Sequence, residues 1–223
     1  MPDNDIQNEK LLADKGLAFF GAVMASISHE LNNVVGIVDQ SAGLLEDLLY
    51  VAKSGKPLPE EKLQTIAERV TAQTQRGVVL IKRMNKFAHS SDEPVIEYDI
   101  NEQLENLVEI ARRKATLKKA GLEASYPDDI IKITGSPFLM QELVYTCIMQ
   151  IIADTQPEDI ISVALKAHED GAQIRIEGRK PQLDTSGDND YLELMTGRIN
   201  GTIESEIRGD RIIFKIAVPK TAV

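Results

Sequence analysis

Two long stretches with apolar residues alternately three and four positions apart constrain this chain more than any other feature. The seam of the first stretch comprises Phe20, Met24, Ile27, Leu31, Val34, Val38, Leu45 and Leu48, with Ser41 filling the one gap. The seam of the second comprises Leu63, Ala67, Val70, Thr74, Gly77, Ile81, Met84 and Ala88. This spacing predicts two amphipathic helices, the first running from about residue 8 to residue 53.

The segment between the two stretches, SGKPLPEE at 54 to 61, contains the Gly and Pro residues that turn a chain. Pro59 followed by Glu60 and Glu61 predicts a helix start, because Pro fits the first turn and acids suit the amino end of the helix dipole. Two antiparallel helices with one apolar seam each leave apolar surface uncovered. We therefore expect a homodimer in which two hairpins form a four-helix bundle; a monomeric hairpin packed on its own second domain is the alternative.

The pattern changes after SSDEP at 90 to 94, a short polar break that contains Pro. We therefore predict a helical-hairpin domain over residues 1–91 and a second domain over residues 95–223. The second domain is predicted to contain a strand in VIEYDI, a helix capped by Asn101 and ended by Gly121, strands in LEASY and IIKI, a helix opened by Ser136 and Pro137, and hairpins turning at 169–171 and at Gly209 and Asp210. Helices over one face of a mixed sheet form an α/β sandwich, so the predicted fold class is α+β.

Charge and composition exclude several functions. The net charge is −10, and residues 1–92 hold 12 acids and 10 bases. Binding to nucleic acid or to an anionic membrane is not expected, because no basic stripe with interleaved aromatics and no Lys or Arg cluster is present. No apolar run near 18 residues and no signal-peptide pattern is apparent, so we expect no membrane span and a cytoplasmic protein. The lone Cys147 fits a buried thiol, and His89 and His168 lack metal-ligand spacing, so we expect no metal site.

His29, within SISHELNNVVGI at 26 to 37, lies away from the apolar seam. The helical period places it about 200° round from Ile27, on the opposite face. Small or short residues surround it on this face: Ala22, Ala25 and Ser26 above, and Asn33 and Gly36 below. We predict that they form the docking face for a partner, because small side chains allow close approach to the imidazole. For Asn33, and for Glu30 next to the histidine, an ordinary solvated helix surface is the alternative.

The segment resembles the H-box of bacterial sensor histidine kinases, with His29 as the phospho-accepting His, Glu30 as the following acid and Asn33 as the residue four positions on. The order of elements after residue 95 resembles the ATP-binding domain of the same kinases, and TGSPFLMQELV at 134 to 144 resembles the run into its N-box. The nucleotide residues of that family do not carry over. Tyr145 and Met149 fall at the two Asn positions, and neither can replace an oxygen ligand for Mg²⁺.

The adenine-reading Asp of the kinases falls on Gly178, followed by Arg179 and Lys180 where the glycine box would continue. SGDNDYLELM at 186 to 195 lacks the second glycine-rich box, and the lid is expected to be deleted. The resemblance therefore implies a degenerate ATPase-like domain with no cofactor or metal bound by this chain.

The resemblance as a whole implies a histidine phosphotransferase. His29 would exchange a phosphoryl group with the aspartate of response-regulator receiver domains, which bring their own Mg²⁺. Glu30 would fix the imidazole tautomer or its protonation, and Asn33 would orient phosphoryl oxygens or a water. Alternatives are a phosphatase acting on phosphorylated receivers and a non-catalytic, pseudokinase-like regulator; an active ATP-dependent kinase fits least, because its motifs are missing.

Overall fold

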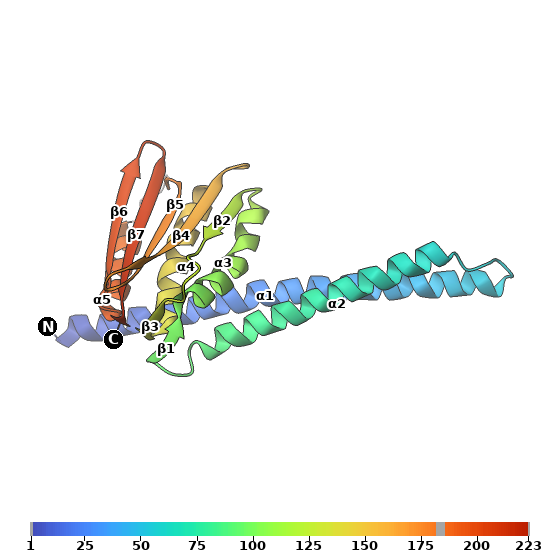
Figure 1. Cartoon of the computed structure of the whole chain (residues 1–223), viewed down its shortest axis with the longest axis horizontal. Coiled ribbons are helices and arrows are strands. Elements are labelled where there is room, and N and C mark those ends of the chain that lie inside the picture. The colour runs from blue at the N-terminus through green and yellow to red at the C-terminus, as the bar shows by residue number, and fades with distance from the viewer. Residues whose placement is uncertain (1, 182–185, 223) are drawn as a thin grey trace. The chain divides into compact units, whose positions relative to one another are not determined.

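The computed structural model describes residues 2–181 and 186–222. The chain divides into two compact units. We call Ala22–Asn85 the hairpin unit, and Met1–Gly21 together with Lys86–Val223 the α/β unit. The two long helices, α1 (Pro2–Lys53) and α2 (Glu60–His89), contribute residues to both units (Figure 1).

Helix α1 begins at Pro2, earlier than the predicted start near residue 8. Pro suits the first turn of a helix, and acidic Asp5 lies close behind it. The prediction missed this start because the apolar seam begins only at Phe20. Upstream of it, Gly16 and Phe19 are buried in the α/β unit, which stabilises the first turns of the helix by packing.

The hairpin unit buries a seam that differs by one position from the predicted seam of α2. Within the hairpin unit, the residues of α2 that are buried or half-buried are Leu63, Ile66, Val70, Gln73, Gly77, Leu80, Arg83 and Met84. The prediction was wrong for Ala67, Thr74 and Ile81, which are exposed. Both stripes obey the three-and-four spacing, and Gly77 lies on the buried one, where a Cβ would stand 3.4 Å from Val34 Cγ1.

On α1 the hairpin unit buries Val23, Ser26, Ile27, Val34 and Ser41. Ser41 tolerates complete burial because its hydroxyl donates to the Ile37 carbonyl at 2.7 Å. The predicted seam residue Leu45 is 38% exposed. The hairpin therefore hides only one side of each helix.

Next to the buried seam runs a second apolar stripe that faces away from the hairpin. We call it the outer stripe; it comprises Met24, Ser28, Leu31, Val35, Val38, Ala42, Leu45 and Leu49 of α1 with Ala67, Thr71, Thr74, Val78 and Ile81 of α2. Val35 is 65% exposed and Ile81 is 45% exposed. Apolar side chains exposed in a row mark a surface that another surface can cover.

Among the described residues, α1 is the one helix whose length and composition would allow it to cross a membrane. This helix does not decide the sequence expectation that the chain has no membrane span. A helix of a bundle passes the same test, so this finding is weak, and the cytoplasmic location stays a prediction.

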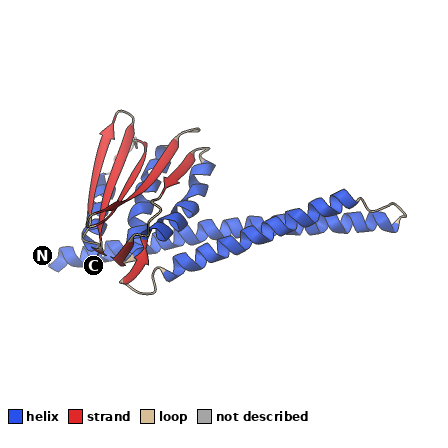
Figure 2. Cartoon of the chain, in the orientation of Figure 1, coloured by secondary structure: helices blue, strands red, loops and turns tan. Residues whose placement is uncertain are grey.

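Besides the parts of α1 and α2 that belong to it, the α/β unit contains two sheets and the helices α3, α4 and α5 among the described residues (Figure 2). The smaller sheet has the order β1 (Ile96–Asp99), β3 (Lys132–Gly135), β8 (Thr221–Ala222). The larger sheet has the order β2 (Gly121–Ser125), β4 (Ile160–His168), β5 (Gly171–Arg179), β7 (Arg211–Pro219), β6 (Thr202–Arg208). Its β2–β4 pair is parallel and the other pairs are antiparallel, so the sheet is mixed.

Helices α3 (Ile100–Leu117), α4 (Pro137–Asp154) and α5 (Ser186–Arg198) pack against the apolar side of the larger sheet. Strand β5 has the alternation that this requires, because Ala172, Ile174 and Ile176 are buried while Gln173 is exposed. The predicted α+β fold class, with long N-terminal helices followed by an α/β sandwich, is confirmed.

Two predicted helix ends differ from the structure. Asp99, and not Asn101, caps α3, because the Asp99 carboxylate accepts from the Asn101 backbone N–H at 2.9 Å. Helix α3 ends at Leu117 and Lys119 takes the left-handed conformation with φ of 60°, so Gly121 is free to begin β2. The predicted Ser136 cap is confirmed: its hydroxyl accepts from the Leu139 N–H at 3.3 Å.

Candidate functional site

His29 is an exposed residue of α1 in the hairpin unit. At about 100° per residue, it lies about 140° from Val34 on the buried seam and about 120° in the other sense from Val35 on the outer stripe. The imidazole therefore points away from both apolar surfaces of the helix. It stays accessible whether or not another molecule covers the outer stripe.

Glu30 does not extend along the helix surface toward solvent. Its Oε2 accepts from Nη2 of Arg76 on α2 at 3.1 Å, and its side chain is 15% exposed. The carboxylate thus connects the two helices next to His29. The sequence analysis missed Arg76, because no local pattern relates two residues that meet only across the hairpin.

Most residues of the predicted docking face are accessible to solvent. Ala25, Asn33 and Gly36 are exposed, Ala22 is half-buried, and a Cβ at Gly36 would meet no atom within 4 Å. Ser26 is not part of the accessible face, contrary to the prediction, because it is only 7% exposed. It lies about 60° from His29 on the side of the buried seam, so the hairpin itself covers it.

The positions of the kinase Mg²⁺ ligands carry no oxygen ligand that is open to solvent. Tyr145 is 7% exposed, and its ring lies 5.0 Å from the ring of Phe19 in α1. Phe19 also contacts Phe87 and Phe138, with 5.3 Å between ring centroids in each pair. Tyr145 is therefore part of an aromatic cluster that attaches the first turns of α1 to α4.

The position of the adenine-reading acid is closed by packing. A Cβ at Gly178 would lie 2.3 Å from Cγ2 of Ile151, so the space of a larger side chain is already filled. The next residue, Arg179, donates from Nε and Nη2 to the Asp159 carboxylate at 2.6 and 2.8 Å. These hydrogen bonds are the main reason that the pKa of Asp159 is lowered to about 2.

The rest of the expected nucleotide site does not compensate. SGDNDYLELM is helical from its first residue, Ser186, as the beginning of α5. Residues 182–185, which belong to the segment expected to have lost its lid, lie outside the described residues. At the positions expected to correspond to the kinase nucleotide site, Tyr145 is thus buried and the space beside Gly178 is filled by Ile151.

A buried carboxylate in α4 was not foreseen from the sequence. Glu142 is 1% exposed and accepts from the Tyr191 hydroxyl at 2.5 Å. Burial raises the pKa of Glu142, while Tyr191 and Lys15 act in the opposite direction. An acid among the apolar residues of α4 was the available signal, but the sequence does not say which element covers it.

Other potential sites in the described part of the chain are unremarkable. No group of three or more His, Cys, Asp and Glu side chains gathers there to hold a metal ion. Cys147 is completely buried, as expected, and burial raises the pKa of its thiol.

Comparison with known proteins gives no family model and no curated protein that matches this chain. Solved structures do match. Two nucleotide-free structures of the catalytic domain of histidine kinase ThkA align over 58% and 59% of this chain and 97% and 100% of their own, each with a TM-score of 0.51 and 12% identity. ThkA in complex with the response regulator TrrA aligns over 96% of this chain and 66% of its own at a TM-score of 0.49 and 15% identity, a likeness too weak to support an inference.

The two stronger matches establish a fold class. The part of the chain that these matches cover shares its fold with the catalytic domain of a histidine kinase. In the chain as a whole, the long helices α1 and α2 precede an α/β domain. At this level of identity the likeness defines the fold alone, and the chemistry rests on the residues themselves.

Proposed function

We propose that this chain is a histidine phosphotransfer protein, which exchanges a phosphoryl group between His29 and the aspartate of response-regulator receiver domains without using ATP. The observation that carries the proposal is the exposed imidazole of His29, which is turned away from both apolar surfaces of the hairpin unit. The close contact at Gly178 and the burial of Tyr145 support the exclusion of ATP. We retain residues 1–91 as the phosphotransfer domain and residues 95–223 as the degenerate ATPase-like domain.

The reaction needs little from this chain beyond an oriented nucleophile. An unprotonated imidazole nitrogen of His29 attacks the phosphorus, the bond from phosphorus to the partner's aspartate oxygen breaks, and a phosphoramidate forms; the reverse transfer restores both groups. The receiver domain supplies Mg²⁺ to neutralise the phosphoryl charge. Asn33, one turn further along the helix, orients phosphoryl oxygens or a water. Glu30 acts as a positioning residue, because its ion pair with Arg76 fixes α2 beside the histidine.

The active form is a homodimer in which the outer stripes of two hairpins meet in a four-helix bundle. The exposure of Val35 and Ile81 supports this, because both would be covered in such a bundle. His29 would remain outside the dimer contact, open to a receiver domain.

The receiver docks on the face formed by Ala22, Ala25, Asn33 and Gly36. Reacting atoms must come within about 3–3.5 Å for in-line transfer, so added bulk there should harm more than loss of charge. We expect Gly36→Trp to abolish phosphoryl exchange while helicity and dimer are retained, since the position has open space around it. Asn33→Ala should preserve docking and change the transfer or dephosphorylation rate.

The decisive experiment incubates the purified chain with a receiver domain carrying radiolabelled acyl phosphate. A phosphotransfer protein acquires acid-labile, alkali-stable label that His29→Gln cannot acquire. Release of inorganic phosphate without label on this chain would instead make it a phosphatase, the role that the exposed Asn33 would serve. If the receiver keeps its acyl phosphate and this chain acquires no label, the chain is a regulator that only binds, and the proposal is refuted. Label acquired from Mg²⁺–ATP alone would restore the kinase interpretation.

A further inference from the structure

Strand β6 forms one end of the larger sheet, and β7 is its only paired neighbour among the described residues (Figure 1). The hairpin turns at Gly209 and Asp210, with Gly209 at φ of 63°, and Arg208 pairs with Arg211 across the turn. In a two-residue hairpin this last pair exchanges both hydrogen bonds, and alternate pairs follow the same rule. Residues 202, 204, 206 and 208 therefore bond to β7, whereas residues 203, 205 and 207 direct their N–H and C=O groups to the free edge.

The side chains of the same three edge residues lie on the helix side of the sheet. Ser205 is opposite Phe214 and Ile203 is opposite Ile216, and both of these β7 residues are fully buried in the core. Beside the edge is a hollow of about 90 Å³, lined by Leu192, Glu193, Ile203, Ser205 and Phe214. Ile207, further along, is 54% exposed. Main-chain groups that are unpaired among the described residues thus adjoin a hollow with a mixed lining, apolar at Leu192, Ile203 and Phe214 and polar at Glu193 and Ser205, with room for one side chain.

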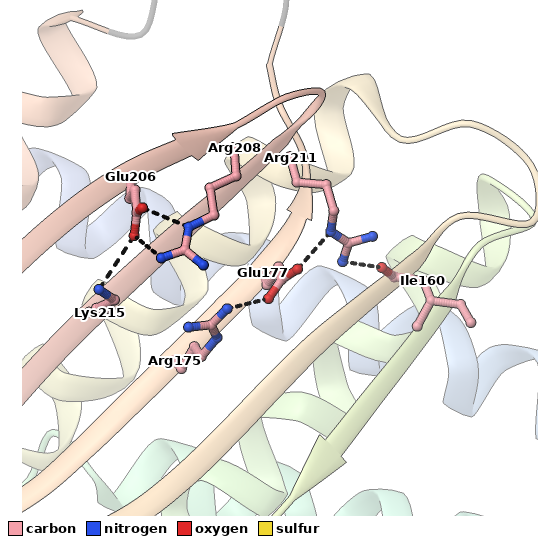
Figure 3. A network of polar contacts seen from close by, with 7 residues as sticks. All are labelled: Ile160, Arg175, Glu177, Glu206, Arg208, Arg211 and Lys215. Carbon is pink, nitrogen blue, oxygen red and sulfur yellow. Dashed lines mark hydrogen bonds and ion pairs between the residues drawn. The ribbon is translucent and has the colours of Figure 1, made fainter.

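Proteins commonly protect a free edge with charged or proline residues, or cover it with another element. The charges of β6 lie on the other face of the sheet (Figure 3). There Glu206 accepts from Arg208 Nε at 2.6 Å and from Lys215 Nζ at 3.5 Å. None of the three edge residues on the helix side is charged, so the edge lacks protection where the hollow opens.

We propose that the β6 edge binds an extended segment of a partner protein as an additional strand. The added strand would place apolar residues at alternate positions, beside Ile203, Ser205 and Ile207, with one of them filling the hollow. Its intervening residues would be basic, because they would lie beside Glu204 and Glu206 on the opposite face. The net charge of −10 on this chain favours the same kind of partner.

A second copy of this chain fits the edge poorly, although the sequence TIESEIR of residues 202–208 is nearly symmetric about Ser205. Antiparallel pairing of two β6 strands about Ser205 would place Glu204 opposite Glu206 of the copy, on both sides of the centre. Like charges directly opposite destabilise a strand pair. A basic segment replaces this repulsion with attraction and leaves the main-chain pairing unchanged.

The test titrates the full chain with a fluorescent, acetylated peptide, about as long as β6, in which valine and lysine alternate. A peptide of equal composition with all lysines grouped at one end is the control. We expect the alternating peptide to bind more tightly than the control and to slow amide hydrogen exchange at residues 203, 205 and 207. Equal binding of the two peptides, or no change in exchange at these amides, would overturn the proposal.

Variants at Ser205 test the edge directly. Ser205→Pro removes an outward N–H without removing a bond to β7, so we expect affinity to fall about tenfold. Ser205→Thr keeps the N–H and should bind like the unmodified chain. Unchanged affinity in Ser205→Pro would place the peptide elsewhere. The amides of residues 203, 205 and 207 could instead be protected from hydrogen exchange without peptide, and more so at higher protein concentration. In that case a second copy occupies the edge and the assignment of the partner is wrong.

Discussion

The close packing of Gly178 against Ile151 can be measured by substitution. Gly178→Ala adds a methyl group 2.3 Å from Cγ2 of Ile151, and both residues are buried, so neighbouring atoms must shift. Overpacking of this kind costs about 1–3 kcal/mol of folding free energy. Ile151→Ala alone removes a fully buried side chain and should cost about 2–5 kcal/mol through lost burial and the resulting cavity.

The two substitutions should be strongly coupled when combined. In the double variant, the methyl group added at Gly178 enters the space that the Ile151 side chain has left. The double variant should therefore be more stable than the sum of the single losses predicts, by about 1–3 kcal/mol. Gly178→Asp should be worse than Gly178→Ala, because it also buries a carboxylate without a partner.

Urea unfolding followed by far-ultraviolet circular dichroism provides the assay. With a slope of about 1–3 kcal/mol per molar urea, this coupling corresponds to a midpoint shift of roughly 1 M at the middle of both ranges, provided that the slope is the same in all four proteins. Additivity within about 0.5 kcal/mol would refute the reasoning, because it would mean that Ile151 does not fill the space beside Gly178.

Three further predictions concern the hairpin unit, the Glu30–Arg76 ion pair and the Asp159–Arg179 ion pair. Ile27 is buried, so Ile27→Asp should unfold the hairpin unit, which circular dichroism would record as lost helicity. Val35 is exposed, so Val35→Asp should keep the helicity but dissociate the proposed dimer, which light scattering would record. A parent protein that is already monomeric would contradict the dimer. Glu30→Gln and Arg76→Met should each lower the free energy of unfolding in urea by less than about 1 kcal/mol, because the Arg76 side chain is largely exposed. The double variant should lose no more than either single variant, because both remove the same ion pair; additive losses would contradict the pairing. Arg179 lowers the pKa of Asp159 to about 2, so this stabilisation is complete above the ordinary Asp pKa of about 4 and is lost as pH falls toward 2. The urea midpoints of the parent protein and Arg179→Met should therefore converge over this interval, and a constant difference would contradict the assignment.

Local signals in the sequence predicted the elements well, because caps, turns and periodicity act over a few residues. The Ser136 cap and the Gly209 turn are examples. Where two local solutions were nearly equal, the prediction failed. Ile66 and Ala67, or Leu80 and Ile81, satisfy the same spacing, and only the register of the hairpin decides which member is buried.

The candidate site depends still more on distant contacts. The exposure of His29 follows from helical period alone, but the burial of Ser26 depends on where α2 lies. The Glu30–Arg76 pair and the Gly178–Ile151 contact join residues on different elements, and no motif encodes either. The sequence therefore predicted that His29 is exposed, but not the contacts that Glu30 and Gly178 make.

The α/β unit is discontinuous in the chain, since the hairpin unit lies between its first 21 residues and the remainder. This has a consequence for the order of folding. Phe19 leaves the ribosome long before Phe138 and Tyr145, its partners in the aromatic cluster, have been made. A hairpin that forms first from local contacts draws Gly21 and Lys86 together and removes most of the entropy cost of closing that loop. Substitutions that weaken the hairpin should therefore slow the final docking of residues 2–21, even where they leave every contact of the α/β unit intact.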